Sequence, residues 1–295
     1  MLRLADTSSR FRGAIRSATA MEKGEGQPAP NPSAVPEIVS FWRSCPLSDP
    51  PFVHPQDLST LRNRAADLLG LPPTNLDQFV TSARFGNSDD HGFHFSLLPV
   101  PYMGNLSRAD ILLLLLNPGL NVADYHAEWN VPEFRRRLAC NLYQDLDGLE
   151  FPFLLLDPEF CWHPGFRWWE RKLHNVATIL ARTRYPGRYR DALCELSNRI
   201  AALELVPYHS SAFNGGKLVD DLPSALCAKG HALMYVQKRA SSGLALVIAM
   251  RNVSAWGLPE LPGLISYPPA LSRGAGLGSN TPGGKAILAR LGLEP

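Results

Sequence analysis

Hydrophobic residues in the second half of the chain form short runs that end in turn residues. Residues 111–116 are a continuous aliphatic run that ends at once in Asn117, Pro118 and Gly119. A short unbroken apolar run of this kind predicts a strand buried inside a parallel sheet. Further strands are predicted over residues 203–206, 244–250 and 264–267, and helices over residues 168–182, 192–202 and 284–291.

Strands that alternate with helices predict an α/β protein with a parallel sheet. In such sheets ligands bind outside the carboxyl ends of the strands. The loops that follow Leu116, Val206, Met250 and Tyr267 are therefore where chemistry is expected.

The first 110 residues have a different character. Residues 21–36 are rich in Pro and Gly, so residues 1–36 are predicted to be a flexible tail. The first 20 residues, with four Arg and one acidic residue, faintly resemble a transit peptide, or they precede a later start at Met21. Residues 37–110 are expected to be a mostly helical extension, with a helix over 58–69 and a possible strand over 93–100. Together with the α/β core, residues 111–295, this extension would make a single domain, residues 37–295.

Composition narrows the class of protein. The chain of 295 residues contains 26 Pro and 23 Gly, and only 19% of it is charged. Proline breaks or kinks a helix, so this proline content excludes a coiled coil or a long helical bundle. The 45% of hydrophobic residues excludes disorder throughout the chain. Five separate cysteines without a Cys-x-x-Cys pair argue against disulfide frameworks, zinc ribbons and iron–sulfur clusters. A reducing, cytoplasmic setting is expected.

Charge and hydropathy bear on the partners. The net charge is +2, which does not itself indicate nucleic acid. Residues 161–200, however, carry eight Lys or Arg against three Asp or Glu, an excess that can face phosphates. The longest apolar run has six residues, against about 20 needed to span a bilayer, so no membrane is expected. We expect a monomer.

Several of the strand-end loops match motifs of one enzyme superfamily. Residues 116–120 (Leu-Asn-Pro-Gly-Leu) and residues 267–273 (Tyr-Pro-Pro-Ala-Leu-Ser-Arg) resemble the first and second motifs of the uracil-DNA glycosylases. Residues 163–169 (His-Pro-Gly-Phe-Arg-Trp-Trp) are similar to a His-Pro segment of the mismatch-specific branch. The strand end at 205–206 and the strand–turn–helix pattern at 246–257 occur in the matching order. The chain thus resembles the uracil-DNA glycosylase superfamily over roughly residues 111–290.

The resemblance implies a fold and an activity. The fold would be a three-layer α/β/α sandwich around a central, mainly parallel four-stranded sheet. The protein would flip a modified or mismatched pyrimidine out of DNA and excise it by hydrolysis, leaving an abasic site. Residues 121–159 would be an insertion, and Tyr267 stands where the family has His or Asn.

Three residues are the expected catalytic groups. Asn117, at the end of the first strand, would orient the attacking water, since an amide is too weak to deprotonate it. Asp124 and Asp157 lie nearby in the sequence and are stronger bases than an amide. An aspartate in either position, however, favours the role of a helix cap or turn residue. Tyr267 or His209 would donate a hydrogen bond to the leaving base.

The base pocket is expected around the first motif, from Leu116, Gly119 and Leu120. Members of the family that act on uracil alone have a bulky tyrosine where this chain has Gly119. A glycine there predicts a pocket that admits pyrimidines with large substituents at C5, such as the hypermodified cytosines of phage DNA. The first candidates for the ring that stacks on the base are Phe160 and Trp162, directly before the His-Pro segment, and the second choices are Tyr125 and Trp129. Each is equally consistent with core packing.

DNA contacts are expected from the second motif and the His-Pro segment. Leu271 matches the family's wedge, which fills the gap left by the flipped base. Ser272, Arg273, Gly274 and Arg167 would contact flanking phosphates. No cofactor or metal is expected, because Asp89–His94 is only a weak metal pattern. No lysine in the motif loops suggests a Schiff base, which favours a monofunctional glycosylase.

Two other classes of function stay open. A nucleic-acid-binding module of the same fold without catalysis is consistent with the substitution at Tyr267. An unrelated α/β hydrolase that acts on a small molecule is the third possibility, although the chain has no Gly-x-Ser-x-Gly elbow.

Overall fold

The structure is a computed structural model that describes most of the chain from residue 36 onward. The described ranges are residues 36–64, 73–87, 89–213, 216–251, 253–268 and 276–294. Residues 35–295 form one compact unit. The expected tail, residues 1–36, lies outside the described residues except for Pro36.

A mixed five-stranded sheet with the strand order β1-β3-β2-β4-β5 forms the centre of this unit. Its strands are β1 (Tyr102–Met103), β2 (Ile111–Leu115), β3 (Ile200–Glu204), β4 (Leu246–Ala249) and β5 (Leu264–Ser266). β3, β2, β4 and β5 are parallel, with Leu113 of β2 opposite Ala202 of β3 and Ile248 of β4. The protein is therefore an α/β protein, as predicted.

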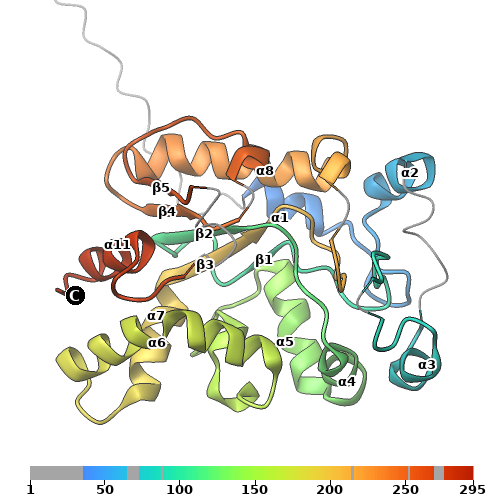
Figure 1. The fold of residues 1–295 in the computed structure, drawn as a ribbon, viewed down its shortest axis with the longest axis horizontal. Helices are drawn as coiled ribbons and strands as arrows, with labels where there is room; N and C mark the ends of the chain where they lie inside the picture. Colours follow the sequence, from blue (N-terminus) through green and yellow to red (C-terminus); the bar gives the residue numbers. More distant parts are fainter. Residues whose placement is uncertain are drawn as a thin grey trace, which may run out of the picture. The chain divides into compact units, whose positions relative to one another are not determined.

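Helices pack on both faces of this sheet (Figure 1). The helices are α1 (Glu37–Trp42), α2 (Pro55–Arg64), α3 (Leu76–Thr81), α4 (Val122–Asn130), α5 (Pro132–Tyr143), α6 (Pro164–Arg184), α7 (Tyr189–Arg199), α8 (Pro223–Tyr235), α9 (Val253–Trp256) and α11 (Pro282–Arg290). Short 3-10 or π turns occur at η2 (Leu154–Leu156), η3 (Pro158–Phe160), η4 (Gly216–Asp220) and η5 (Val236–Ala240). In the part of the chain that the structure describes, no helix is long and apolar enough to cross a membrane.

β2 supplies side chains to two separate hydrophobic cores. Ile111, Leu113 and Leu115 pack with residues of α5, α6, α7 and α11. Leu112 and Leu114 pack with residues of α1 and α8 on the opposite face. Because successive side chains of a strand point to opposite faces, a strand buried on both sides must be apolar at every position. This is the physical reason for the unbroken aliphatic run.

The expectation of a four-stranded, mainly parallel sheet is wrong in one respect. β1 adds a fifth strand, which pairs antiparallel with the outer edge of β3. The chain turns away directly after it at Gly104, whose φ is +88° and whose missing Cβ would lie 2.6 Å from the carbonyl oxygen of Ile200. Two residues of antiparallel pairing have too little hydrophobic pattern to be detected in the sequence.

The N-terminal region is less helical than expected. Its described part has three short helices, α1 to α3, joined by irregular segments, and it contributes β1 to the sheet. The possible strand over residues 93–100 is irregular. Its backbone N–H groups bond instead to two loop carbonyls and one side chain, since His94 donates to His209 O, Val100 to Pro207 O and Leu98 to a carboxylate of α4.

Most of the predicted core elements are confirmed, with shifted bounds. The helices expected from residues 168, 192 and 284 begin earlier, at Pro164, Tyr189 and Pro282. The strand expected over 203–206 is β3, which begins at Ile200 and ends at Glu204. The stretch 121–159, expected to be an insertion, forms α4, α5 and the two 3-10 turns η2 and η3, and it packs against the same face of the sheet as α6 (Figure 1).

One carboxylate connects the amino end of the sheet with two other elements. Asp110, directly before β2, accepts hydrogen bonds from Arg199 Nε at 2.7 Å and from Arg290 Nε at 2.8 Å. Burial alone would raise the pKa of Asp110, but the hydrogen bonds and charges of these arginines outweigh it and lower the pKa below its usual value. Asp110 thereby joins the start of β2 to the ends of α7 and α11.

We predict that Asp110→Asn lowers the free energy of unfolding by about 2 kcal/mol at pH 7, because the carboxylate's three charge-assisted hydrogen bonds with Arg199 and Arg290 are lost or weakened. Urea denaturation would measure it. A lowered folded-state pKa stabilises the fold above the ordinary carboxyl pKa, and this stabilisation is lost as the pH falls through the folded-state pKa. The difference between variant and wild type should therefore shrink in acid.

The matched control is Asp147→Asn, which removes the exposed ion pair with Arg108 and should leave stability unchanged. If Asp110→Asn lowered the free energy of unfolding by the same amount at every pH, the charge of Asp110 would not be the cause of the lost stability.

Candidate functional site

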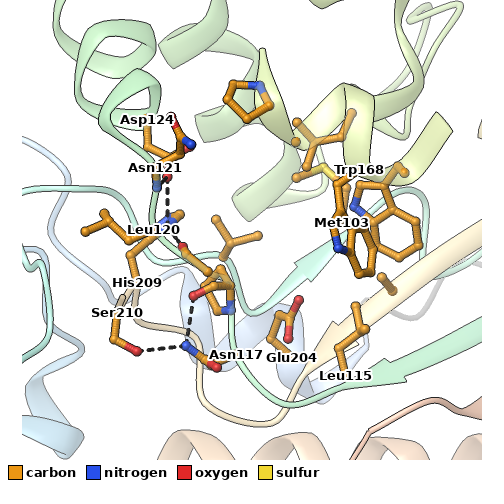
Figure 2. Close-up of a pocket in the computed structure, with 18 of the residues that line it drawn as sticks. Met103, Leu115, Asn117, Leu120, Asn121, Asp124, Trp168, Glu204, His209 and Ser210 are labelled. Atoms are coloured by element: carbon orange, nitrogen blue, oxygen red, sulfur yellow. Dashed lines mark hydrogen bonds and ion pairs between the residues drawn. The ribbon is translucent and has the colours of Figure 1, made fainter. Parts of the chain in front are cut away.

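A cavity of about 570 Å³ opens at the carboxyl ends of β2 and β3 (Figure 2). The chain leaves β2 toward β3 and leaves β4 toward β5, so the direction of the connections reverses between β2 and β4. Open α/β sheets bind ligands beside such a reversal. Asn117 and Arg251, which follow these two strands, both line the cavity. Its other polar lining residues include Asn121, Asp124, Glu128, His163, Glu204, His209, Ser210 and Ser211.

Asn117 has its amide group held in one orientation. Its Nδ2 donates to the carbonyl oxygen of Pro118 at 2.8 Å and to Ser210 Oγ at 3.0 Å (Figure 2). An amide nitrogen has two protons, and both are engaged. The carbonyl oxygen of Asn117 is then the atom left to accept a hydrogen bond from a water or a ligand.

His209 supports the loop that carries Asn117. Its Nδ1 lies 2.8 Å from the carbonyl oxygen of Gly119, so this nitrogen carries the proton and donates it. Burial lowers the pKa of His209, while Asp124 and nearby carbonyls offset part of this effect. The ring is therefore neutral at pH 7. Because its proton is already bonded to Gly119, His209 does not have the free donor that was expected from the sequence for a leaving base.

Asp124 acts as a helix cap. Its Oδ2 accepts from the backbone N–H of Asn121 at 2.6 Å, as part of the capping box that begins α4. Its Oδ1 lies 3.1 Å from Nε2 of His163, the N-cap of α6, whose Nδ1 accepts from Gly165 N. Asp157 caps η3 and pairs with Arg137, away from the cavity lining. For both aspartates the structure favours the cap over the catalytic base.

Two glutamates that were not predicted from the sequence also line the cavity. Glu128 on α4 is buried, and its Oε2 accepts from Leu98 N at 2.8 Å. Burial raises the pKa of Glu128 to about 8, although the Leu98 bond and Arg135 favour the charged form.

Glu204 is the last residue of β3, opposite Leu115 of β2. Its Oε2 is buried without a hydrogen-bond partner among the described residues. Burial raises the pKa of Glu204 well above its usual value, and Arg251 offsets only part of this shift. The sequence did hold a signal for it, because Glu204 is the one charged residue within the apolar stretch from Ile200 to Val206.

The aromatic wall of the cavity comes from α5 and α6. Trp168 and Trp169, in the first turns of α6, and Phe134 of α5 line it, together with Leu116 and Leu120. The predicted stacking rings are elsewhere. Their side chains do not line the cavity, because Tyr125 is buried against Phe79, Phe160 packs edge-on against Phe134, and Trp162 is 37% exposed beside His163.

Tyr267 does not join Asn117 in this cavity. Its hydroxyl donates to the carbonyl oxygen of Gly276 at 2.6 Å and accepts from Gly283 N at 3.0 Å. Gly283 has no room for a side chain, because a Cβ there would lie 2.5 Å from this hydroxyl. Tyr267 therefore fastens the start of α11 to the end of β5, which is a structural role rather than the expected catalytic one.

The remaining predicted DNA contacts divide into two groups. Arg167 is exposed on α6 and does not line the cavity. The other four predicted contacts belong to the second motif and lie outside the described residues: Leu271, Ser272, Arg273 and Gly274.

A group of cations lies beside the aromatic wall. Lys172 Nζ is 5.3 Å from the centre of the Trp168 ring. Burial lowers the pKa of Lys172, and the positive charges of Arg251 and Arg171 lower it further. These three side chains, Arg171, Lys172 and Arg251, are called the basic rim below. Like charges held close together favour an anionic ligand.

Neither a metal centre nor a known relative defines this site. The described residues contain no group of three or more His, Cys, Asp or Glu that could hold a metal ion. Comparison with protein-family models, curated proteins and solved structures finds no match for this chain.

We predict that Glu128→Gln makes stability less dependent on pH. A folded-state pKa raised to about 8 stabilises the fold fully below the ordinary carboxyl pKa, and this stabilisation is lost as the pH rises through 8. The free energy of unfolding of the wild type should fall between pH 5 and pH 9, by up to about 1.4 kcal/mol per unit from this group. Urea denaturation across this range should give a flatter profile for the variant.

Glu159→Gln is the control, because Glu159 is exposed and should leave the profile unchanged. Identical slopes for wild type and Glu128→Gln would contradict a protonated Glu128.

Proposed function

We propose that the protein is a monofunctional DNA glycosylase, which takes a flipped-out, modified pyrimidine into this cavity and hydrolyses its bond to the sugar. The proposal includes the finer description of the fold, a three-layer α/β/α sandwich of the uracil-DNA glycosylase type. The parallel order of β3, β2, β4 and β5, with helices on both faces, supports it.

The observation that carries the proposal is the position of Asn117. It follows the buried central strand, both protons of its amide group are engaged, and it lines the cavity, which leaves its carbonyl oxygen to accept a hydrogen bond. Hydrolysis of a base–sugar bond needs a water held in line with the breaking bond. An oriented amide oxygen meets this need, because it positions the water without having to deprotonate it.

The remainder of the cavity suits a nucleotide. A flipped base is held between aromatic or apolar side chains, and Trp168, Trp169 and Phe134 provide such a wall. The basic rim lies next to this wall, where the phosphates flanking the base would need positive charge. Aromatic and cationic groups side by side are typical of proteins that hold single nucleotides out of a strand.

One observation favours the second candidate function, a nucleic-acid-binding module without catalysis. Tyr267 stands at the motif position where the resembled family has His or Asn, yet its hydroxyl is used within the fold. A site that lacks this donor needs another group to stabilise the departing base, or it only binds.

We predict that Asn117→Ala lowers base release at least about 100-fold, because the water is no longer oriented. The substrates would be duplexes that carry uracil, thymine mismatches, 5-hydroxymethylcytosine or its glucosylated form. Strand breaks that appear only after alkali treatment report abasic sites. Asn130→Ala, at an exposed position on α4, is the control and should behave as wild type.

The other outcomes decide between the candidate functions. DNA binding without alkali-sensitive sites, unchanged by Asn117→Ala, would replace the glycosylase by the binding module. Failure to bind DNA at low salt would exclude both.

We also predict that Gly119→Tyr changes the choice of base. A Cβ at Gly119 meets no atom within 4 Å, and φ there is not positive, so the backbone does not require glycine. A tyrosine side chain would occupy part of the cavity. Excision of bases with large C5 substituents should fall at least about tenfold relative to excision of unsubstituted bases, measured in single-turnover assays.

Gly230→Tyr controls for added bulk, because Gly230 on α8 also has open space at its Cβ and lies on the other face of the sheet. If Gly119→Tyr lowered the excision rates of large and small bases equally, Gly119 would not determine the size of base that the cavity admits.

A further inference from the structure

The cavity contains one acidic group that the fold itself leaves without a function. The Oε2 atom of Glu204 is buried and has no hydrogen-bond partner among the described residues. By contrast, Glu128 and Asp124, the other carboxyls of the lining, accept backbone N–H groups at 2.8 Å and 2.6 Å. A buried polar group without a partner destabilises a protein, so its retention suggests a partner outside the chain.

The register of the sheet directs this group into the cavity. Glu204 and Ala202 lie two residues apart on β3, and therefore on the same face, which is the face covered by α5 and α6. Ala202 has a small side chain, which leaves space at the base of the cavity. Figure 2 shows the Glu204 carboxyl in the space between Asn117 and Trp168. A base stacked on the wall of α6 would present its edge to this carboxyl.

We infer that Glu204 is the proton donor to the departing base, and that the substrate class is therefore a cytosine-type pyrimidine. This inference rests on the proposed glycosylase function and deepens it. A carboxylic acid can donate its proton to ring atom N3 of cytosine, while its carbonyl oxygen accepts from the amino group at C4. Uracil and thymine carry a hydrogen on N3, and their carbonyl oxygens are much weaker bases, so they cannot take the proton.

The reaction balances in four transfers. The bond between sugar C1′ and base N1 breaks, and its electron pair moves to the base. The proton of Glu204 passes to N3 of the base. A water adds its oxygen to C1′ and releases one proton to solvent, and the Glu204 carboxylate takes a proton back from solvent. The products are the free base and an abasic sugar, with one water consumed.

Burial keeps this carboxyl protonated before the reaction. Desolvation raises the pKa of Glu204 well above its usual value, and the positive charge of Arg251 offsets only part of this shift. The other titratable groups that line the same cavity are Tyr102, Asp124, Glu128, His163 and His209, beside the cation Arg251. Because a general acid must hold its proton at the working pH, a desolvated carboxyl is suited to this task and an exposed one is not.

The test compares wild type with Glu204→Gln, which preserves shape and hydrogen bonding but has no acidic proton. In single-turnover assays on a duplex with 5-hydroxymethylcytosine, or its glucosylated form, excision should fall about 10²- to 10⁴-fold. The wild-type rate should decrease as the pH rises through the pKa of Glu204, and the residual rate of the variant should lack this decrease. Glu260→Gln, at an exposed position, should match the wild type.

A second measurement does not depend on activity. Infrared difference spectra of the free protein at pH 7 should show a neutral carboxylic acid band in the wild type that is missing in Glu204→Gln. If the carboxylic acid band is absent from the wild-type-minus-variant spectrum, Glu204 is ionised, and the inference is overturned. Thermal unfolding of both proteins checks that the variant folds.

Substrate pairs separate the failure of this inference from the failure of the proposed function. Wild-type excision of 5-hydroxymethyluracil in preference to 5-hydroxymethylcytosine, or an unchanged rate in Glu204→Gln, would overturn the role of Glu204 while leaving a glycosylase. Absence of base release from every duplex by the wild type would overturn the glycosylase itself.

Discussion

Complete burial of β2 on both faces is the constraint on which the remainder of the structure depends. Its five residues pack into two cores at once, so helices must cover both sides of the sheet and parallel strands must flank it. β2 ends at Leu115, and Pro118, three residues later, has no N–H to continue a ladder. The chain leaves the sheet there, and Asn117 is brought to the edge at which a cavity opens.

Burial also explains why acidic and basic side chains of the same cavity are both neutral or shifted toward the neutral form. Desolvation raises the pKa of Glu128 and Glu204 and lowers that of His209. Glu128 and His209 use their side chains to hold backbone groups of neighbouring loops, namely Leu98 N and Gly119 O. They thereby stabilise the walls. Glu204 holds nothing within the described residues, and this contrast distinguishes a group that builds the cavity from one that is available to a ligand.

Local pattern predicted the elements that are strongly periodic, and tertiary contacts decided the others. The α6 helix has a helical apolar period, and β2 is a short apolar run bounded by turn residues, so both were predicted correctly. The segment 93–100 alternates like a strand, yet its partners are loop carbonyls and a glutamate, which no local pattern encodes. β1 is held by the pairing of Tyr102 with Leu203 and of Met103 with Ala202, which are distant in the chain, and two residues have too little pattern to predict this pairing.

The sequence by itself determined the α/β class, the buried strand, and the position of Asn117 and Gly119 at its carboxyl end, because these follow from hydrophobic pattern and from proline. Only the tertiary structure decided which side chains share the cavity. It placed Trp168 and Trp169 in the wall instead of Tyr125, Phe160 and Trp162, turned Tyr267 toward α11, and left Glu204 without a partner. The physical reason is that burial and desolvation are set by neighbours distant in the chain, and these decide whether a polar group is a cap, a support or a reactive group.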